Sequence, residues 1–502
     1  MKNTYWLLSL FLILCFSMAC QDSRLKLHDE MVRDESEFWY KRSISHVLLN
    51  RMIGKETQVV WSTTFHTAAP VPLGAVGPSK YTRMLQGVLQ NDSLGRVLKS
   101  AVEDKLNVIL VIGDGMGNMH MALPIYKRYA QKKSESTYFE RIMSEGACGY
   151  LYTGTARGLV TGSAASGTAI ACGTKTLMNM IGVDSVGTPL ESALKLAIKG
   201  KYKTALVTDA GITDATPAVF YAHTINRDEE ESIANQLEMC DGLDVILGGG
   251  ARMFIPRGTK FSDIENVPES LNFESSRKDS RNLIDAFKKR DYQFCSTLPQ
   301  LQKAGKGKVL GLFNSGGLPA SIDRDLSTAT IPTVKQMGEK ALELISGTES
   351  PYFAMIECAR IDWEAHDNDI GAVYKAVEEM NTVLEDAYKK YKESPGNTLL
   401  VFTADHETGG LEVAYRKMPE EEAFYKQMKN GEQWKNITNP LTYSKFGANL
   451  ERQKSTVSKV LSKSKTLIEL KRNVKEDLGI QISDEQAELL FYSMTDYKKY
   501  KD

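Results

Sequence analysis

Two pairs of acidic and histidine residues in this chain have the spacing of metal ligands. Asp362 and His366 lie four positions apart, so on one helical turn their side chains share a face and can bind one ion. Asp405 and His406 are adjacent and are soon followed by glycines, an arrangement typical of a zinc pair at the end of a strand. A single histidine is as often an ordinary hydrogen-bonded residue, but the two pairs together indicate a metal site.

Oxygen ligands for a harder cation occur in two further segments. Asp114 stands between Gly113 and Gly115, where its carboxylate can approach a metal with little steric hindrance. Asp214 and Thr216 follow another apolar run and offer the oxygen atoms that Mg²⁺ prefers. Taken alone, a Gly-Asp-Gly sequence is more often a simple turn.

A nucleophile and a phosphate-binding residue can also be named. Ser163 opens a segment of small residues that is expected to form a helix, and a hydroxyl at a helix N-terminus lies in a positive potential that favours phosphate. Arg227 offers a planar fork that matches two phosphate oxygens. The simpler readings are an N-cap serine and an arginine paired with the acidic residues 228–231.

Short apolar runs precede most of these polar residues and predict the strands that position them. Runs of this kind, buried on both faces, are typical of parallel sheets covered by helices. Stretches with helical period alternate with them, such as Ser192–Ile198 and Thr333–Leu344, so the expected fold class is α/β, with a largely parallel open central sheet and helices on both faces. Ligands in such sheets bind at the carboxyl ends of the strands, where these residues should converge. The predicted strands are Val108–Ile112, Ala205–Thr208, Val245–Leu247, Phe353–Ile356 and Leu399–Phe402.

Five spaced motifs together resemble the alkaline phosphatase family, over roughly residues 101–411. The segments GDGMG, VTGSAASGT, DATPAxxxAHxxxR, ExxxIDxxxH and TADHExGG occur here in that family's order. The resemblance implies hydrolysis of small phosphomonoesters through a phosphoserine, with two Zn²⁺ sites and one Mg²⁺ site. It implies that Ser163 is the nucleophile and that Arg227 clamps the phosphate. The implied ligands are Asp114, Asp405 and His406 for one zinc, Asp362 and His366 for the other, and Asp114, Thr216 and Glu357 for magnesium, with Asp214 acting through water.

The order of one segment departs from the family. The resemblance implies a third histidine at the second zinc, in an HTG segment near the C-terminus, yet no histidine follows His406. Residues 61–68 read WSTTFHTA and are followed by Val-Pro-Leu and Gly-Pro, which resembles the missing segment moved to the front. We therefore expect a circular permutation in which His66 is the third ligand, which is tolerable where domain termini lie close together. A chance match in an N-terminal extension is the alternative.

Gly162 is a second departure, because the family usually has Asp before the nucleophile. That Asp helps to orient the phosphate-binding arginine, so we expect Arg227 to be held more loosely. Cys358 and Trp363 also differ from common family residues, and Trp363 is expected to shape the phosphate pocket. A competing hypothesis is a catalytically impaired metal- or phosphate-binding surface lipoprotein of the same fold. A sulfatase is disfavoured because no proline follows Ser163 two residues later.

The N-terminus and the overall charge bear on location and partners. Lys2 precedes an apolar run from Trp6 to Phe16 that is too short to span a bilayer, which indicates a signal peptide over residues 1–19. Cys20 after Ala19 resembles a lipobox, so we expect an exported lipoprotein, periplasmic or on the outer membrane or cell surface, with plain secretion as the alternative. A net charge of −1 gives no basic field for nucleic acid.

The expected organisation has three parts after the signal peptide. Residues 20–100 hold the displaced HTG-like region, residues 101–419 the catalytic α/β core, and residues 420–502 a helical C-terminal region of the same domain. A homodimer is compatible with the family resemblance, and the sequence does not fix the oligomeric state. Disulfide pairing among the five cysteines after Cys20 also stays open.

Overall fold

The computed structural model describes residues 44–324, 330–414 and 443–499, which form two compact units. The larger unit is Gly54–Thr456, and the described part of the smaller one is residues 44–53 and 457–499. The expected signal peptide, Cys20 and residues 420–442 lie outside the described residues. No helix within the described ranges is long and apolar enough to cross a membrane.

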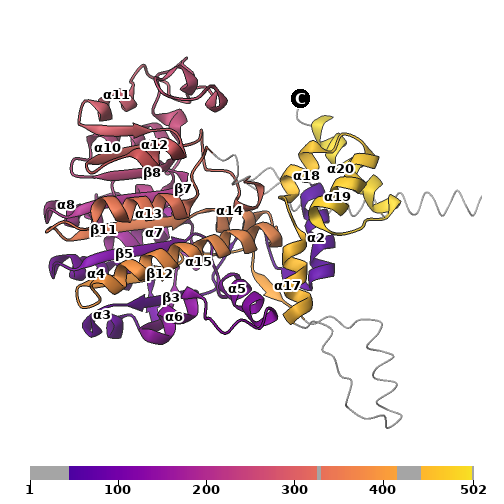
Figure 1. Ribbon diagram of the computed structural model, residues 1–502, viewed down its shortest axis with the longest axis horizontal. Helices are drawn as coiled ribbons and strands as arrows, with labels where there is room; N and C mark the ends of the chain where they lie inside the picture. The colour runs from indigo at the N-terminus through magenta and orange to yellow at the C-terminus, as the bar shows by residue number, and fades with distance from the viewer. Residues whose placement is uncertain (1–43, 325–329, 415–442, 500–502) are drawn as a thin grey trace, which may run out of the picture. The chain divides into compact units, whose positions relative to one another are not determined.

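A ten-stranded sheet forms the centre of the larger unit (Figure 1). All strands run parallel except β3, which pairs antiparallel with both of its neighbours. This arrangement confirms the expected fold class. In spatial order the strands are β4 (Gly87–Gln90), β6 (Ala147–Tyr152), β3 (Val71–Val76), β12 (Thr398–Thr403), β5 (Asn107–Gly113), β11 (Tyr352–Cys358), β7 (Lys203–Gly211), β8 (Val245–Gly249), β10 (Lys308–Leu312) and β9 (Tyr292–Cys295).

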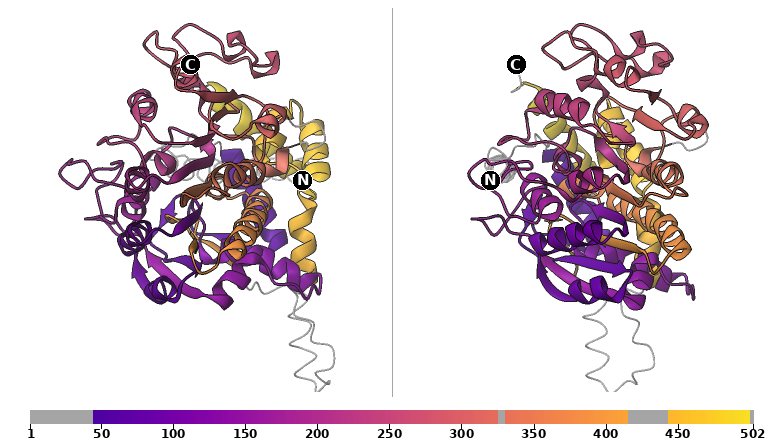
Figure 2. Two further views of the ribbon diagram at one scale, coloured as in Figure 1. Left: turned by 60° about the vertical axis from the view of Figure 1, so that its left-hand side comes forward. Right: turned by 90° about the vertical axis from the view of Figure 1, so that its left-hand side faces the viewer.

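Helices cover both faces of this sheet (Figures 1 and 2). On one face α13 (Val334–Ile345) packs on β7 and β11, and α15 (Ile370–Glu393) packs on β5 and β12. On the other face α4 (Asn91–Glu103) contacts β5, α8 (Ala193–Lys199) contacts β7, and α7 (Ser163–Cys172) packs against α4. Because both faces are covered, every residue of β11 and β12 is buried, as the unbroken apolar runs predicted.

The boundaries of the two units differ from the expected domain boundaries. Residues 59–103 belong to the larger unit, because β3 lies between β6 and β12 and β1 (Val59–Trp61) pairs with β14 (Leu411–Val413). Helix α17 (Tyr443–Arg452) also belongs to this unit and packs on α5 (Asn118–Ala130). The catalytic core therefore draws on both flanks of residues 101–419.

The smaller unit is helical. It contains most of α2 (Ile44–Thr57) together with α18 (Val457–Lys463), α19 (Leu467–Leu478) and α20 (Asp484–Lys499). His46 and Ser458 join α2 to α18 through a 2.7 Å hydrogen bond. Thr466 caps the start of α19, and Gly479 ends it in the left-handed conformation. The expected helical character of the C-terminal residues holds for α17 to α20.

Candidate active site

The polar residues singled out in the sequence follow the carboxyl ends of neighbouring parallel strands. Asp114 follows β5, Glu357 lies near the end of β11, and Asp405 follows β12. Strands β12, β5 and β11 are adjacent in the sheet. Their carboxyl ends therefore bring these carboxylates to one edge, where α14 (Arg360–His366) and α7 also begin.

His66, Asp362 and His366 form the first candidate metal group, with ligand atoms within 4.8 Å of one another. The Nδ1 atom of His66 lies 2.8 Å from the Thr161 carbonyl, and Nδ1 of His366 lies 2.6 Å from the Thr64 carbonyl. A carbonyl only accepts, so each Nδ1 carries the proton and each Nε2 presents a lone pair. The two Nε2 atoms nevertheless lie 3.1 Å apart. Two lone pairs at this distance need a positive charge between them.

That distance fits a shared metal ion. Two nitrogens bound to one tetrahedral zinc at 2.0–2.1 Å lie about 3.4 Å from each other. Asp362 adds its carboxylate, with Oδ2 3.3 Å from Nε2 of His366 and Oδ1 3.7 Å from Nε2 of His66. Burial lowers the pKa of His66, which disfavours a proton as the bridging charge. The donor set thus suits Zn²⁺.

Asp114, Asp405 and His406 form the second candidate group, and all three residues are buried. Nε2 of His406 lies 3.5 Å from Oδ1 of Asp114 and 3.3 Å from Oδ2 of Asp405. These two carboxylate oxygens are buried and have no hydrogen-bond partner. Buried polar atoms are almost always satisfied, so this pair of oxygens indicates a ligand such as a cation.

The pKa shifts of Asp114, Asp405 and His406 also favour a bound cation. Burial first, and then the charges of Asp405 and Asp362, raise the pKa of Asp114 well above its ordinary value. Burial and then Asp362 raise the pKa of Asp405 to about 7. Burial lowers the pKa of His406 well below its ordinary value, which keeps the imidazole in the neutral form that binds metals. A bound cation would compensate this concentration of carboxylates.

The two groups touch each other. The His66 ring stacks on the His406 ring with 3.7 Å between centroids. Gly115 allows the close approach of Asp362, because a Cβ at Gly115 would lie 2.8 Å from Oδ1 of Asp362 and φ is +72°. The two candidate ions would therefore be neighbours.

The residues expected at the magnesium site are only partly brought together. Thr216 donates to Oδ2 of Asp114 at 3.3 Å, and the Glu357 carboxylate contributes to the raised pKa of Asp114. Glu357 also accepts a hydrogen bond from Thr208. The Asp214 carboxylate instead caps α9 (Ala215–Ala218) and pairs with Arg227.

Ser163 is the first residue of α7, and its Oγ lies 3.3 Å from Nε2 of His406. The serine oxygen is thus next to the second metal group and at the positive end of a ten-residue helix. The first N–H groups of a helix have no intrahelical partner and can bind an anion. The structure places Ser163 at the start of a helix, as the sequence predicted.

Arg227 is held by Asp214 rather than by residue 162. One guanidinium nitrogen donates to Asp214 Oδ1 at 2.7 Å, and the Arg227 backbone N–H donates to the Asn179 carbonyl at 2.9 Å. Gly162, which directly precedes the nucleophile, has no side chain that could orient Arg227. The simpler reading from the sequence paired Arg227 with the acidic residues 228–231, whereas the ion pair in the structure is with Asp214.

Thr408 and Ser166 also contact the two groups, and neither is among the site residues expected from the sequence, although Ser166 lies in the VTGSAASGT segment. The Thr408 hydroxyl donates to Asp362 and lies 3.2 Å from Nδ1 of His406, so it links the two groups. Ser166 donates to the Asp405 carbonyl at 2.6 Å and accepts from the buried Asn91 at 2.9 Å. Such partners fix the orientation of ligands and are expected around metal sites.

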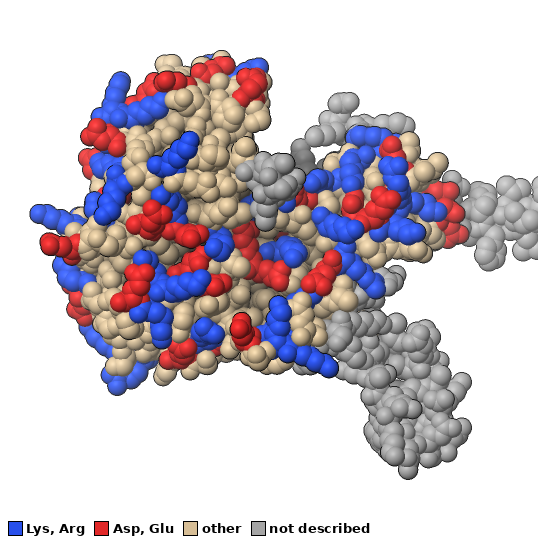
Figure 3. All heavy atoms as spheres, viewed as in Figure 1, with Lys and Arg blue, Asp and Glu red and all other residues tan. Residues whose placement is uncertain are grey.

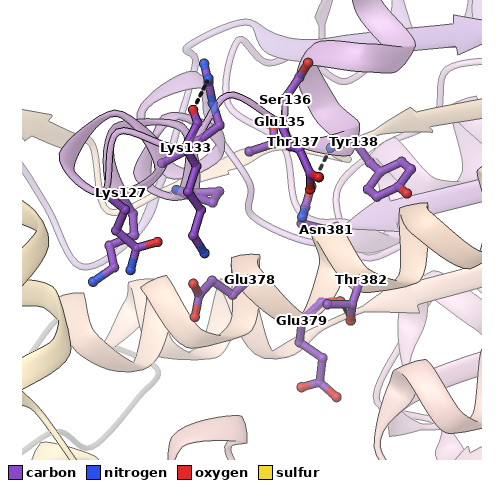
Figure 4. A pocket seen from close by; sticks show the side chains of 13 residues that line it. Lys127, Lys133, Glu135, Ser136, Thr137, Tyr138, Glu378, Glu379, Asn381 and Thr382 are labelled. Atoms are coloured by element: carbon purple, nitrogen blue, oxygen red, sulfur yellow. Dashed lines mark hydrogen bonds between the residues drawn. The ribbon is translucent and has the colours of Figure 1, made fainter.

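Trp363 and a pocket beside α15 are two other features of the larger unit. Trp363 packs on Gly317, whose added Cβ would lie 2.2 Å from the indole, and the Arg360 guanidinium lies 5.0 Å from the indole centre. A polar pocket of ≈ 470 Å³ between α5, residues 131–138 and α15 includes none of the candidate ligands (Figure 4). Its buried cation Lys127 is paired with Glu451.

The fold and the site define a class of protein, namely α/β proteins with a serine at a helix start beside two groups of potential metal ligands. The alkaline phosphatase family model matches residues 105–488, and the chain belongs to the alkaline phosphatase family. It is 33% identical over 353 residues to alkaline phosphatase 3 of Bacillus subtilis strain 168, covering 68% of this chain and 70% of that one. It is 30% identical over 363 residues to the alkaline phosphatase of Escherichia coli K12, covering 62% and 72%.

Solved structures agree with this assignment. The alkaline phosphatase of Thermus thermophilus superposes with a TM-score of 0.62 and 27% identity, covering 77% of this chain and 76% of that one. A cold-active alkaline phosphatase from Shewanella sp. superposes with a TM-score of 0.58 and 26% identity, covering 79% and 88%.

Proposed function

We propose that this chain hydrolyses phosphomonoesters through a phosphoserine formed on Ser163. The serine oxygen attacks phosphorus, the bond from phosphorus to the ester oxygen breaks, and the alcohol leaves with a proton. Water then attacks the phosphoserine, releasing inorganic phosphate and restoring the serine. The observation that carries this proposal is the position of Ser163 Oγ, 3.3 Å from a histidine that faces two unpartnered carboxylate oxygens.

Three metal sites belong to the proposal. His66, Asp362 and His366 would hold one Zn²⁺, and Asp114, Asp405 and His406 the other. Asp114, Thr216 and Glu357 would hold Mg²⁺, with Asp214 acting through water. Bound metal ions in such a site supply charge stabilisation for the attacking and leaving oxygens of a phosphoryl transfer. The first two donor sets contain imidazole nitrogen, which suits Zn²⁺, and the third contains oxygen alone, which suits Mg²⁺.

The chain's own groups bind and orient the phosphate. The first N–H groups of α7 face the serine and favour an anion there. Arg227, positioned by Asp214, offers two parallel N–H donors to the phosphate oxygens. Gly162 contributes no carboxylate, and Arg227 forms an ion pair with Asp214. We expect weaker phosphate binding and faster product release than with an aspartate at position 162.

The circular permutation is part of the proposal. The family match begins at residue 105, so His66 lies in front of it, yet His66 completes the first donor group. Residues 66–67 pair with β13 (Glu407–Thr408), and the Thr67 hydroxyl donates to Glu407. These contacts support the proposal that residues 54–100 correspond to a segment that follows the catalytic core in other members of the family.

The test of the nucleophile is Ser163→Ala, with Ser144→Ala on the exposed surface of α6 (Tyr138–Glu145) as the matched control. With a radiolabelled substrate and acid quenching, the parent and the control should yield acid-stable phosphoserine and Ser163→Ala should yield none. Turnover by Ser163→Ala should fall by several orders of magnitude. Labelling of Ser163→Ala at the parental level would contradict the proposal.

Export as a lipoprotein and formation of a homodimer are further parts of this proposal. Cys20→Ala should move the protein from the membrane fraction to the soluble fraction without changing its specific activity, because lipid attaches far from the catalytic motifs along the chain. Soluble parent protein would favour plain secretion. Sedimentation of the purified chain at several concentrations decides between monomer and dimer.

A further inference from the structure

Large apolar side chains are exposed on the loop before Ser163 and on loops joined to it by backbone contacts. Leu159 and Val160 lie in the loop before Ser163, and Met178 approaches Gly162 in that loop. Val186 and Ile225 lie on two loop segments next to each other, since a Cβ at Gly187 would lie 3.6 Å from Cγ2 of Ile225. These exposed residues, with their relative accessibilities, are Leu159 (83%), Val160 (41%), Met178 (48%), Val186 (83%) and Ile225 (62%). Exposed apolar side chains that gather near a catalytic group commonly mark a binding surface.

Backbone contacts join these loops into one rim. The Ala156 N–H donates to the Thr176 carbonyl at 2.8 Å, which links the loop before Ser163 to the loop that bears Met178. The Arg227 N–H donates to the Asn179 carbonyl at 2.9 Å, so the residue after Met178 also anchors the phosphate-binding arginine. Met178 is thus placed between the nucleophile and Arg227.

Gly162 brings Met178 close to the reacting centre. A Cβ at Gly162 would lie 3.3 Å from Sδ of Met178 and 3.6 Å from Cε1 of His66. The thioether therefore sits over the residue before the nucleophile, on the side of His66, and is half exposed. A flexible thioether adapts to apolar groups of different shape.

We propose that Met178 forms an apolar wall for the alcohol part of the substrate, so that the enzyme prefers phosphomonoesters of apolar alkyl or aryl alcohols. This inference rests on the proposed phosphomonoesterase activity. The phosphate is bound at the start of α7 and by Arg227, and the ester group must then extend from phosphorus toward the solvent-exposed rim. Its contact with Met178 removes apolar surface from water, and each fully buried methylene is worth about a fourfold gain in binding.

Ethyl and n-hexyl phosphate are the probes, because they share a leaving-group class and differ only in methylene groups. The parent should hydrolyse n-hexyl phosphate with a kcat/KM at least about fourfold higher than ethyl phosphate, which corresponds to one buried methylene. Met178→Gln should bring this ratio close to one, whereas Met178→Leu should keep most of it. Inhibition by inorganic phosphate should be the same in the parent and in Met178→Gln, since phosphate has no ester group.

Met239→Gln is the matched control, because Met239 is 65% exposed and lies at the end of α10 (Glu230–Met239), before the amino end of β8. It should leave the hexyl-to-ethyl ratio unchanged. An equal kcat/KM for the two esters in the parent, or a ratio that Met178→Gln preserves, overturns the inference while the phosphomonoesterase proposal stands. If neither ester nor an aryl phosphate is hydrolysed, the proposed function itself fails.

Discussion

At the scale of single residues, main-chain carbonyls fix which ring nitrogen of His66 and of His366 carries the proton. The carbonyls of Thr161 and Thr64 hold the Nδ1 protons of His66 and His366, which leaves both Nε2 atoms available to bind a metal. A hydrogen bond of this kind to the second ring nitrogen fixes the tautomer and the ring orientation. The segment of residues 61–67 therefore contributes to the site in two ways, through the His66 side chain and through the Thr64 carbonyl that orients His366.

His66→Ala should weaken the zinc held with Asp362 and His366 by at least about 100-fold, because a coordinate bond and part of the surrounding cage are lost. The other group keeps its full donor set, so Ser163 should still react with activated aryl phosphates better than with alkyl phosphates. Zinc content by mass spectrometry after dialysis measures the effect, with His46→Ala in the smaller unit as the control. Parental zinc content in His66→Ala would make its match to the family segment a coincidence.

Thr408→Val should lower metal affinity and turnover by about 10–100-fold, because its hydroxyl links Asp362 to His406 and outer partners of metal ligands have effects of this size. Thr408→Ser retains the hydroxyl and should behave like the parent. The measurement is activity against added Zn²⁺ after treatment with EDTA. Equal metal titrations for the valine and serine variants would exclude this linking role.

The parts of the site that could be predicted from sequence were those with a side-chain pattern. Asp362 and His366 share a helical face, and Asp405 and His406 are adjacent, so their pairing was visible in the sequence. The orienting carbonyls of Thr64 and Thr161 had no such signal, because every residue has a carbonyl. The roles of the individual residues in catalysis are still predictions.

At the scale of elements, the helix that begins with Ser163 is positioned by close packing against α4. Every residue of α7 is buried, and its small side chains let the two helices approach. A Cβ at Gly95 of α4 would lie 2.5 Å from the carbonyl oxygen of Ala169 and 2.5 Å from the backbone nitrogen of Gly173. Only glycine fits at this crossing without movement of α7.

Gly95→Ala should destabilise the protein by about 1–3 kcal/mol, the usual cost of overpacking a tight core. It should also raise the KM for phosphomonoesters, because α7 must shift and carries Ser163 with it. Urea denaturation and steady-state kinetics test both effects. Gly396→Ala is the control, since no atom lies within 4 Å of its added Cβ. Equal urea midpoints for the two variants would contradict the tight crossing.

The five strands predicted from apolar runs are all present, as β5, β7, β8, β11 and β12. Three strands that the apolar runs did not predict have other patterns. β6 alternates buried and exposed residues, and β4 is mostly exposed at the sheet edge. β3 contains a proline and a glycine, which weaken a strand pattern, although its residues are all buried. These strands form because they pair with neighbouring strands in the sheet, and the periodicity of a sequence carries no information about such pairing.

At the scale of the whole molecule, the proposed permutation has a direct test. Residues 21–104 can be moved behind Asp502 through a Gly-Ser linker, so that the chain starts at Lys105 between α4 and β5. The break falls in a connection of three residues, Asp104–Leu106, and the described ends of the chain belong to one compact unit. Flexible linkers cost little loop entropy as they lengthen, so the rearranged chain should fold and hydrolyse aryl phosphates.

The activity and thermal melting of the rearranged protein measure this outcome. As a control, the same linker inserted after Gly396, in the turn before β12, leaves the order of the chain unchanged. An unfolded rearranged protein beside a folded control would contradict a displaced family segment.

The face of the molecule shown in Figure 3 has no large region of a single charge sign. On the face in Figure 3, positive and negative side chains are interspersed, in keeping with the formal net charge of −1. Long-range attraction of anionic substrates should therefore be weak, and the association rate should depend little on salt. Measuring kcat/KM for an aryl phosphate at low and high ionic strength checks this, and a steep fall with salt would contradict it.

The position of β3 between β6 and β12 has a consequence during synthesis of the chain. β6 is made soon after β3, but the residues of β12 that pair with it, Leu400–Phe402, follow more than 320 positions later. A ribosome that adds about 5–20 residues per second leaves one edge of β3 without its neighbour for roughly 20–60 s. An apolar strand with an open edge is a site for aggregation. We therefore expect that the nascent chain needs protection from aggregation until β12, the last strand of the central sheet in chain order, has been made. A chaperone, or translocation in an unfolded state, would provide it.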